Sequence, residues 1–228
     1  MSRALVVTAV EAERAAVLNG LGAPGLAVDV HAPSTREHGV DVVVAGVGPA
    51  AAAANAAIVL SIAEVLGHPY HHVVCMGIGG ALDGRADLGD TVLSTASIAA
   101  DLGAESPEGF LPVVDLGFGR NVIDTDETLV GRLQAAIGAV RFGPVLTVNT
   151  VTGSAARAQE LAGRHPDALV EAMEGYGVAC AADAMRTPFA EIRTISNAVG
   201  PRDRDAWRIP DALAALAKAA AGVGTLVA

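Results

Sequence analysis

Two polar side chains stand at the ends of two apolar runs late in the chain. Glu174 follows Met173, and Asn197 follows the run 189–196. Groups at the carboxyl ends of strands collect in one crevice of an open α/β sheet. A carboxylate can hold a sugar diol and an amide can hold the edge of a planar heterocycle, so this pair could form a binding site. Alternatively, Glu174 is a solvated residue at the start of a helix.

Glu11 and Glu13 form a second pair of carboxylates, where the first apolar run gives way to a predicted helix. Residues two apart on a helix point to different faces, so at most one of them should enter a cleft. Both could instead only complement the helix dipole, which is worth about 0.3–1 kcal/mol each. The spacing alone favours this second interpretation.

Glycine clusters at 46–48 and 77–80 each follow a predicted strand. Neither completes a G-x-G-x-x-G fingerprint, and neither is a P-loop, since no Lys-Ser/Thr follows. Each cluster is either a simple turn or a place where the backbone approaches a ligand closely. Taken singly, the clusters do not decide between the two.

Two further residues stand out by their surroundings. Arg193 lies inside an apolar run, and a buried guanidinium must be paired; Glu171 and Glu174 are the candidate partners. Trp207 is the only tryptophan and lies in the charged run 202–208. That run could also be a self-neutralising surface loop.

The balance of charge excludes several partners. With a formal net charge of −10, the chain does not favour a phosphate backbone, so no nucleic acid is expected. Apolar runs such as 50–60 are shorter than the roughly 18 residues of a membrane span, so no membrane association is expected. Cys75 and Cys180 lie in apolar surroundings typical of buried free thiols. The chain is therefore expected to be soluble and cytoplasmic.

Composition also bears on assembly and cofactors. Hydrophobic residues make up 52% of the chain and charged residues only 18%, which predicts a homo-oligomer, a dimer or dimer-based, that buries part of this surface. The six histidines show no metal-ligand spacing. No metal and no cofactor are expected.

Alternating strand and helix patterns predict the elements that position these groups. Strands are expected at 4–9, 41–45, 73–76, 90–97, 144–149 and in the two late runs. Helices are expected from Glu11, from Pro49, after a cap at Asp124 or Thr125, after a cap at Ser154, and from Asp211. Loops or hairpins are expected at 28–40 and 101–121. Without repeats or composition breaks, residues 1–228 are predicted to form a single domain, a three-layer α/β/α sandwich around a mixed, largely parallel sheet.

Taken together and in order, the motifs resemble the methylthioadenosine/S-adenosylhomocysteine nucleosidase and purine nucleoside phosphorylase superfamily. They cover nearly the whole chain: AVEAE at 9–13, AGVG at 45–48, MGIGG at 76–80, LGD at 88–90, ME at 173–174 and ISN at 195–197. EAMEG at 171–175 and SNAVGPRDRD at 196–205 are most similar to a branch that releases hypoxanthine from a nucleoside in an alternative menaquinone pathway.

The resemblance implies a role for each of several residues. Glu13 matches the carboxylate that orients and deprotonates the attacking water. Glu174 would accept hydrogen bonds from the ribose hydroxyls, with Arg193 supporting it. The other residues expected to contact the nucleoside are Ile78, Gly79, Gly80, Val151, Thr152 and Met173. Ile78 departs from the family, because relatives often carry serine there.

Asn197 is the more informative departure, because adenine-cleaving relatives carry aspartate at this position. An amide can donate to purine N7 and to a 6-oxo oxygen, whereas a carboxylate would repel that oxygen. A wrong pairing leaves a buried polar group unsatisfied, at a cost of roughly 1–3 kcal/mol. Asn197 therefore favours a 6-oxopurine such as hypoxanthine. Since an amide is a poor acid, it would assist the leaving base by hydrogen bonding.

Hydrolysis is expected rather than phosphorolysis. Phosphorolysis requires a cradle of backbone amides and arginines, but the first strand leads into Glu11 and Glu13, without a Gly-Asp-Pro-x-Arg loop. The nucleoside of the resembled branch ends in a carboxyphenyl ketone. Trp207 is expected to stack on that ring, and Arg208, or else Arg202 or Arg204, is expected to bind the carboxylate. The alternatives are a nucleosidase for inosine or methylthio-type nucleosides, a phosphorylase, or a non-catalytic nucleoside-binding protein.

Overall fold

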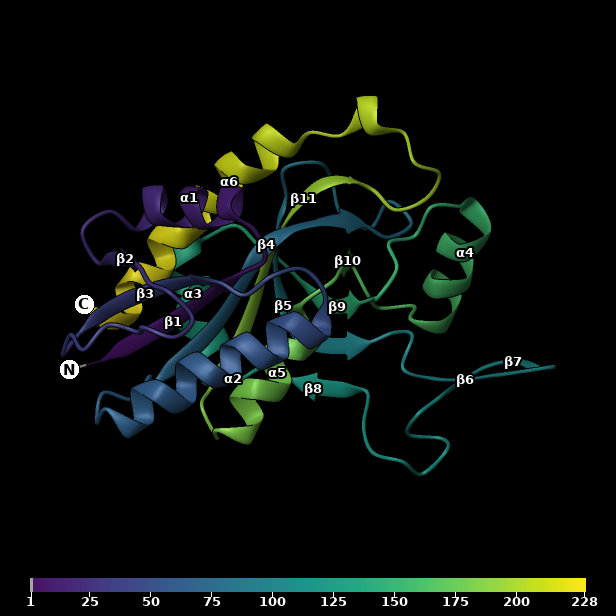
Figure 1. Ribbon diagram of the computed structural model, residues 1–228. Helices are drawn as coiled ribbons and strands as arrows, with labels where there is room; N and C mark the ends of the chain where they lie inside the picture. The colour runs from purple at the N-terminus through teal and green to yellow at the C-terminus, as the bar shows by residue number, and fades with distance from the viewer. Residues whose placement is uncertain (1) are drawn as a thin grey trace.

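A computed structural model describes residues 2–228, which fold around a nine-stranded sheet of order β10-β9-β5-β11-β4-β1-β3-β2, with β8 paired to β5 (Figure 1). The strands are β1 (Arg3–Thr8), β2 (Gly25–Ala27), β3 (Gly39–Val44), β4 (His72–Ala81), β5 (Thr91–Ala99), β8 (Val122–Asp124), β9 (Arg141–Thr147), β10 (Val170–Ala172) and β11 (Phe189–Ala198). Pairs β11–β5, β10–β4 and β5–β8 are antiparallel, and the other pairs are parallel.

Helices cover both faces of the sheet (Figure 1). They are α1 (Glu11–Leu21), α2 (Pro49–Val65), α3 (Glu127–Ile137), α4 (Ala155–Arg164), α5 (Gly175–Ala184) and α6 (Ile209–Gly224), with short 3-10 turns η1 (Arg204–Ala206) and η2 (Thr225–Val227). Successive side chains of a strand point to opposite faces. Leu5 and Val7 of β1 therefore pack with α2 and α5, while Ala4 and Val6 pack with α1, α3 and α6. The predicted α/β/α sandwich with a mixed sheet is confirmed.

The C-terminal helix is apolar for a reason internal to the fold. The segment Ile209–Val227 has the length and composition that could also cross a membrane. One side of it, including Leu216, Ala220 and Val223, is fully buried in the core under α1 and the sheet. Packing in the core accounts for its apolar face.

Most predicted elements lie within a few residues of the observed ones, but the strand predicted at 73–76 is longer. β4 continues through Gly77–Gly80 to Ala81, so this glycine cluster is part of a strand and not a turn. A side chain at Gly77 would collide with neighbouring side chains, because its Cβ would lie 2.6 Å from both Glu13 Oε1 and Arg193 Nη1. The glycines let other groups approach the strand closely.

The start of α3 also differs from the prediction. Asp126 caps the helix, its side chain accepting a hydrogen bond from the Leu129 backbone N–H at 2.8 Å. The two residues expected as caps lie just before it, and Asp124 ends strand β8, which pairs with β5. The cap at Ser154 is as predicted.

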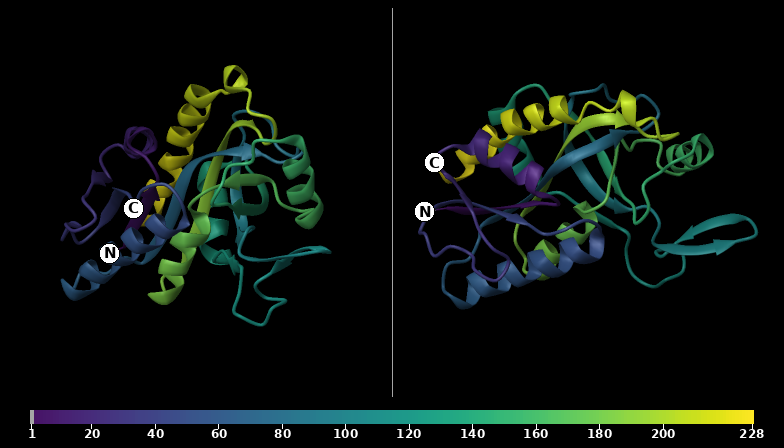
Figure 2. Two further views of the ribbon diagram at one scale, coloured as in Figure 1. Left: turned by 45° about the vertical axis from the view of Figure 1, so that its right-hand side comes forward. Right: turned by 45° about the horizontal axis from the view of Figure 1, so that its top comes forward.

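The predicted excursion 101–121 contains a two-stranded hairpin, β6 (Gly103–Ser106) and β7 (Gly109–Pro112). The hairpin projects from the body of the molecule (Figure 2). Large apolar side chains in this excursion are exposed, with Val114 at 51% and Phe118 at 80%. These side chains therefore do not pack into the hydrophobic core of this chain.

Candidate active site

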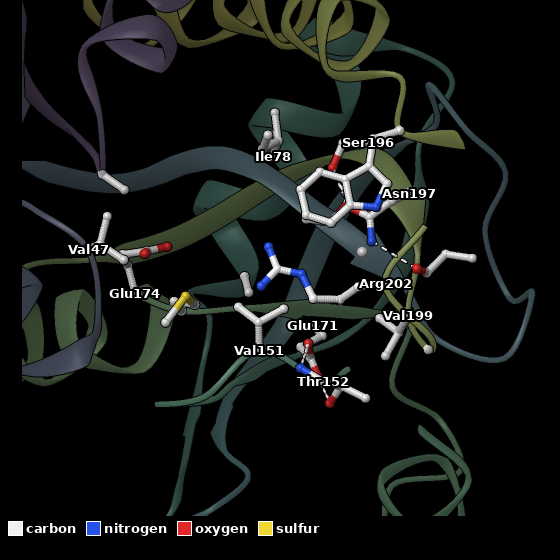
Figure 3. A pocket seen from close by; sticks show the side chains of 18 of the residues that line it. Val47, Ile78, Val151, Thr152, Glu171, Glu174, Ser196, Asn197, Val199 and Arg202 are labelled. Carbon is white, nitrogen blue, oxygen red and sulfur yellow. Dashed lines mark hydrogen bonds between the residues drawn. The ribbon is translucent and has the colours of Figure 1, made fainter. Parts of the chain in front are cut away.

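A cavity of about 240 Å³ lies at the carboxyl ends of β1, β4 and β11 and beside β10 (Figure 3). Parallel strands bring their carboxyl ends to one edge of the sheet, which is why residues distant in sequence meet here. The predicted site residues that line the cavity are Glu13, Ile78, Gly79, Gly80, Val151, Thr152, Met173, Glu174, Asn197 and Trp207. Arg193 and Arg208 do not line it.

Glu13 is buried at the cavity wall, whereas the Glu11 side chain is 69% exposed and pairs with Arg14. Glu13 Oε1 accepts a hydrogen bond from the Ile78 backbone N–H at 2.9 Å, and Oε2 accepts one from the Ala9 N–H at 2.9 Å. Only one carboxylate of the pair enters the cavity, as helical spacing predicts. Its role is therefore not confined to the helix dipole.

The electrostatics of Glu13 suit proton transfer. Burial raises the pKa of Glu13 above its ordinary value, while the nearby Arg193 charge and the hydrogen bonds from Ile78 and Ala9 act in the opposite direction. A carboxylate with a raised pKa, placed at a cavity and held by two strands, is a good general base.

Arg193 lies beneath the cavity floor and is 1% exposed. Its Nη1 lies 3.2 Å from Glu174 Oε2, and its Nε donates to Glu191 Oε1 at 2.9 Å. Of the two predicted partners, Glu174 is confirmed and Glu171 is wrong. Glu191 is fully buried and also accepts a hydrogen bond from Ser97. Sequence reasoning missed Glu191, although residues two apart on a strand share a face.

Glu174 is anchored from two sides. Arg193 binds Oε2, and the Gly48 backbone N–H donates to Oε1 at 3.3 Å. Gly48 has a φ of +92°, a conformation that favours glycine. The glycine cluster after β3 thus lets its backbone reach a carboxylate of the site. Glu174 is 6% exposed, so it is not a solvated helix start.

Asn197 is turned into the cavity by an irregularity in β11, where the pairing register with β4 shifts between Ile195 and Asn197. Its Oδ1 accepts a hydrogen bond from Ser196 Oγ at 2.8 Å, and its Nδ2 donates to the Ala198 carbonyl at 2.8 Å. An amide nitrogen carries two hydrogens. One N–H of the oriented amide therefore stays available to a bound molecule.

Glu171 lines the cavity and is paired with Thr152. The Thr152 backbone N–H donates to Oε1 at 2.9 Å, and the Thr152 hydroxyl donates to Oε2. Burial raises the pKa of Glu171, whereas both hydrogen bonds from Thr152 lower it. A second oriented acidic group therefore stands in the wall, at a position that sequence reasoning considered only as a partner of Arg193.

Trp207 and Arg202 also line the cavity. The guanidinium carbon of Arg202 lies 5.7 Å from the centre of the indole ring. Arg208 instead turns away, its guanidinium donating to the Asp205 carbonyl at 3.4 Å. Among the three arginines considered, only Arg202 lines the cavity.

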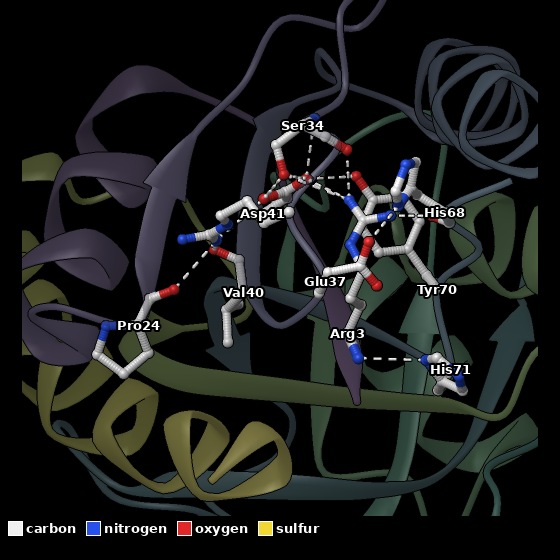
Figure 4. A network of polar contacts seen from close by, with 10 residues as sticks. Arg3, Pro24, Ser34, Glu37, Val40, Asp41, His68, Tyr70 and His71 are labelled. Atoms are coloured by element: carbon white, nitrogen blue, oxygen red, sulfur yellow. Dashed lines mark hydrogen bonds and ion pairs between the residues drawn. The ribbon is translucent and has the colours of Figure 1, made fainter. Parts of the chain in front are cut away.

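A separate polar cluster lies at the amino end of β1 (Figure 4). Arg3 Nη2 lies 3.0 Å from Asp41 Oδ2, and the Tyr70 hydroxyl donates to the same oxygen at 2.6 Å. Ser34 also binds Asp41, which ties the loop before β3 to the sheet. Burial is the main cause that raises the pKa of Tyr70, and the hydrogen bond to Asp41 raises it further. The hydrogen bonds and ion pairs of this cluster connect β1, the loop before β3 and Tyr70. Within residues 2–228, no group of three His, Cys, Asp or Glu side chains is placed to hold a metal ion.

The fold and this site define a nucleoside-processing class. Residues 4–228 match the family model of the phosphorylase superfamily. Among solved structures, a 5'-methylthioadenosine/S-adenosylhomocysteine nucleosidase from Colwellia psychrerythraea has a TM-score of 0.78 at 20% identity, over 99% of this chain and 96% of that one. A futalosine hydrolase mutant from Helicobacter pylori has a TM-score of 0.77 at 16% identity, over 96% of each chain.

Comparison with proteins of similar sequence identifies a narrower family. A futalosine hydrolase from Streptomyces coelicolor is 52% identical over 94% of this chain and 92% of the relative. A futalosine hydrolase from Acidothermus cellulolyticus is 46% identical over 96% of this chain and 89% of the relative. The chain belongs to the phosphorylase superfamily and, within it, to the futalosine hydrolase family. That family is the branch that the motifs at 171–175 and 196–205 resemble.

Proposed function

We propose that the protein hydrolyses the N-glycosidic bond of futalosine, releasing hypoxanthine and dehypoxanthine futalosine in menaquinone biosynthesis. Membership of the futalosine hydrolase family supports this activity. The structural observation that carries it is the meeting of Glu13, Glu174 and Asn197 around one cavity. This reaction uses a general base for the attacking water, a carboxylate that binds the ribose hydroxyls, and an amide that binds the purine.

The geometry supports a proposed step for each group. Glu13 takes a proton from water, whose oxygen forms the new bond to the anomeric carbon of the ribose. Glu174, held by Arg193 and Gly48, accepts hydrogen bonds from the ribose hydroxyls. The bond to the purine nitrogen breaks, its electron pair passes to the purine, and the free N–H of Asn197 stabilises the negative charge that develops there. A proton from a water molecule completes hypoxanthine, and Glu13 returns the proton that it took to the solvent.

Water is favoured over phosphate by the charges around the cavity. Within residues 2–228, Arg202 is the only basic side chain that lines it. The guanidinium of Arg193 lies below the floor and is committed to Glu174 and Glu191. The two carboxylates of Glu13 and Glu174 would repel a phosphate ion at the reacting carbon. The site therefore lacks the anion cradle that phosphorolysis requires.

Arg202 and Trp207 are suited to the distal half of futalosine. Its carboxyphenyl ring would stack on the indole, and its carboxylate would pair with the guanidinium of Arg202. Both side chains line the cavity and lie close together. Of the three arginines considered from the sequence, Arg202 is the one that we assign to the carboxylate.

Chromatographic assay of purified protein tests the activity. Hypoxanthine should be released from futalosine at the same rate with and without phosphate, and methylthioadenosine should be a much poorer substrate. Turnover that strictly requires phosphate would identify a phosphorylase instead. Faster release of adenine from methylthioadenosine would identify a nucleosidase of that type, and binding without turnover would identify a nucleoside-binding protein.

We also propose that the protein is a homo-oligomer built from dimers. The excursion 101–121 exposes Val114 and Phe118, and Leu102 at its base is 43% exposed. Leu102 lines a mostly apolar hollow with Ala53 of α2 and Tyr176 of α5. A second copy of the chain would cover both surfaces. Light scattering during gel filtration measures the mass, and a monomer at micromolar concentration would contradict the proposal.

A further inference from the structure

Glu171 and Asn197 flank one residue of β4. In the pairing of β10 with β4, Glu171 stands opposite Gly80; in the pairing of β11 with β4, Asn197 stands opposite the same Gly80. Neighbouring strands are about 4.8 Å apart, so the two backbones are roughly 10 Å apart across Gly80. That separation leaves room for one planar heterocycle between the two side chains.

The side chains of both residues face the cavity. A Cβ on Gly80 would lie 3.0 Å from Asn197 Nδ2, so this face of β4 carries the amide. A Cβ on the preceding Gly79 would lie 2.5 Å from Val170, which is buried on the other face. Side chains alternate along a strand, so Glu171 projects opposite to Val170, on the side of Gly80 and Asn197. Figure 3 shows Glu171 and Asn197 in different parts of the cavity wall.

Thr152 orients the carboxylate of Glu171 by donating two hydrogen bonds to it. Both carboxylate oxygens accept a hydrogen bond from this one residue, from its backbone N–H and from its hydroxyl. A carboxylate oxygen can accept more than one hydrogen bond. Glu171 is 5% exposed and is oriented by these two hydrogen bonds, yet it still has acceptor capacity toward the cavity that it lines.

A 6-oxopurine and a 6-aminopurine present different hydrogen-bonding groups along the edge that carries N1 and the 6-substituent. A 6-oxopurine carries an N–H donor at N1 beside its 6-oxo acceptor, whereas a 6-aminopurine carries a lone pair at N1. A carboxylate attracts the first and repels the second. We propose that Glu171 accepts the N1–H of the purine while the one free N–H of Asn197 donates to the edge formed by O6 and N7. The two residues then select a 6-oxopurine from two sides.

This inference rests on the proposed function and adds a specificity determinant to it. Asn197 alone reads only the acceptor side of the base, and a rotated amide can adapt to a 6-amino group. An ionised carboxylate has no hydrogen to donate, whichever way it rotates. In its ionised form, Glu171 therefore supplies the stronger rejection of adenine, because it leaves a buried polar mismatch with the lone pair at N1.

The competing explanation is that Glu171 only holds the loop at Thr152. Glu171→Gln separates the two, because glutamine has nearly the same shape but can present an N–H to adenine N1. Titration calorimetry with free hypoxanthine and adenine needs no turnover, so it is independent of whether futalosine is the substrate. Wild type should bind hypoxanthine about 10- to 100-fold more tightly than adenine, and Glu171→Gln should reduce this ratio at least fivefold. Glu160→Gln, on the exposed side of α4, should leave the ratio unchanged.

A measurement on the wild type alone protects the test against a variant that does not fold. 1-Methylhypoxanthine lacks the N1–H, and it should bind at least tenfold more weakly than hypoxanthine. Equal binding of hypoxanthine and 1-methylhypoxanthine overturns the inference. A Glu171→Gln variant that weakens the binding of hypoxanthine and of adenine by the same factor also overturns it. Failure of wild type to hydrolyse futalosine, with the base preference intact, would instead overturn the proposed function alone.

Discussion

Glu13 and Arg193 meet over the α-carbon of Gly77, where a Cβ would lie 2.6 Å from an oxygen of the one and a nitrogen of the other. The proposed general base and the arginine proposed to support the ribose site are thus placed by the absence of a side chain in β4. Both groups are buried, with Glu13 at the cavity wall and Arg193 beneath the cavity floor.

Gly77→Ala should therefore impair catalysis more than folding. Contacts below 3.0 Å force Glu13 and Arg193 to shift, and small misplacements of catalytic groups can cost about 100-fold in rate. We expect kcat for hypoxanthine release to fall 10-fold or more. Gly131→Ala, in helix α3 with open space around it, should keep full activity and gain about 0.5–1 kcal/mol of stability. Equal kcat in both variants would contradict the assignment.

Glu13→Gln should abolish most turnover without abolishing binding. General-base catalysis contributes roughly 10²- to 10⁴-fold, and an amide cannot take the proton from water. Steady-state kinetics should show kcat reduced by at least 100-fold, while calorimetry shows hypoxanthine binding retained. Glu11→Gln is the matched control on the same helix, since this side chain is 69% exposed. Near-normal turnover of the Glu13 variant would remove it as the base.

The acid limb of the pH profile should report Glu13. Burial raises its pKa, so the carboxylate becomes protonated, and inactive as a base, at a higher pH than an exposed glutamate. The value of kcat/KM should therefore fall as the pH decreases through an apparent pKa above about 4.5. The residual activity of Glu13→Gln should lack this limb. An unchanged limb in that variant would assign it to another group.

Asn197→Asp should shift base preference toward 6-aminopurines. The carboxylate repels a 6-oxo oxygen but accepts hydrogen bonds from a 6-amino group. The ratio of kcat/KM for futalosine to that for its 6-amino analogue should decrease at least tenfold, in line with a mismatch of about 1–3 kcal/mol. An unchanged ratio would show that Asn197 does not contact the base edge.

Arg202→Ala and Trp207→Ala should lower kcat/KM for futalosine but not for inosine, because inosine lacks the distal carboxyphenyl group. Each should lower kcat/KM for futalosine about 10-fold, since a carboxylate–arginine pair is typically worth about 1.5–3 kcal/mol. Inosine serves as the control substrate for the same variants. If only Arg208→Ala reduced kcat/KM for futalosine, the carboxylate would belong to Arg208.

The order of the elements, the class of fold and most of the candidate site could be predicted from the sequence. Periodicity and caps depend on neighbouring residues, so β1, α1, α2 and the cap at Ser154 could be predicted locally. Helical spacing also predicted that Glu11 and Glu13 would not share an environment. Ordered motifs pointed to the superfamily because their combination is specific even where each one is weak.

The groups that meet across strands could not be predicted, because their pairing depends on the three-dimensional arrangement of the sheet. Arg193 pairs with Glu191 and Glu174, and Glu171 pairs with Thr152, because of strand order and register. Register is set by the packing of the whole sheet, which no local pattern contains. The same long-range packing extends β4 through its glycines and brings Arg202 to the cavity in place of Arg208. Residue types were visible in the sequence, but their partners depended on the fold.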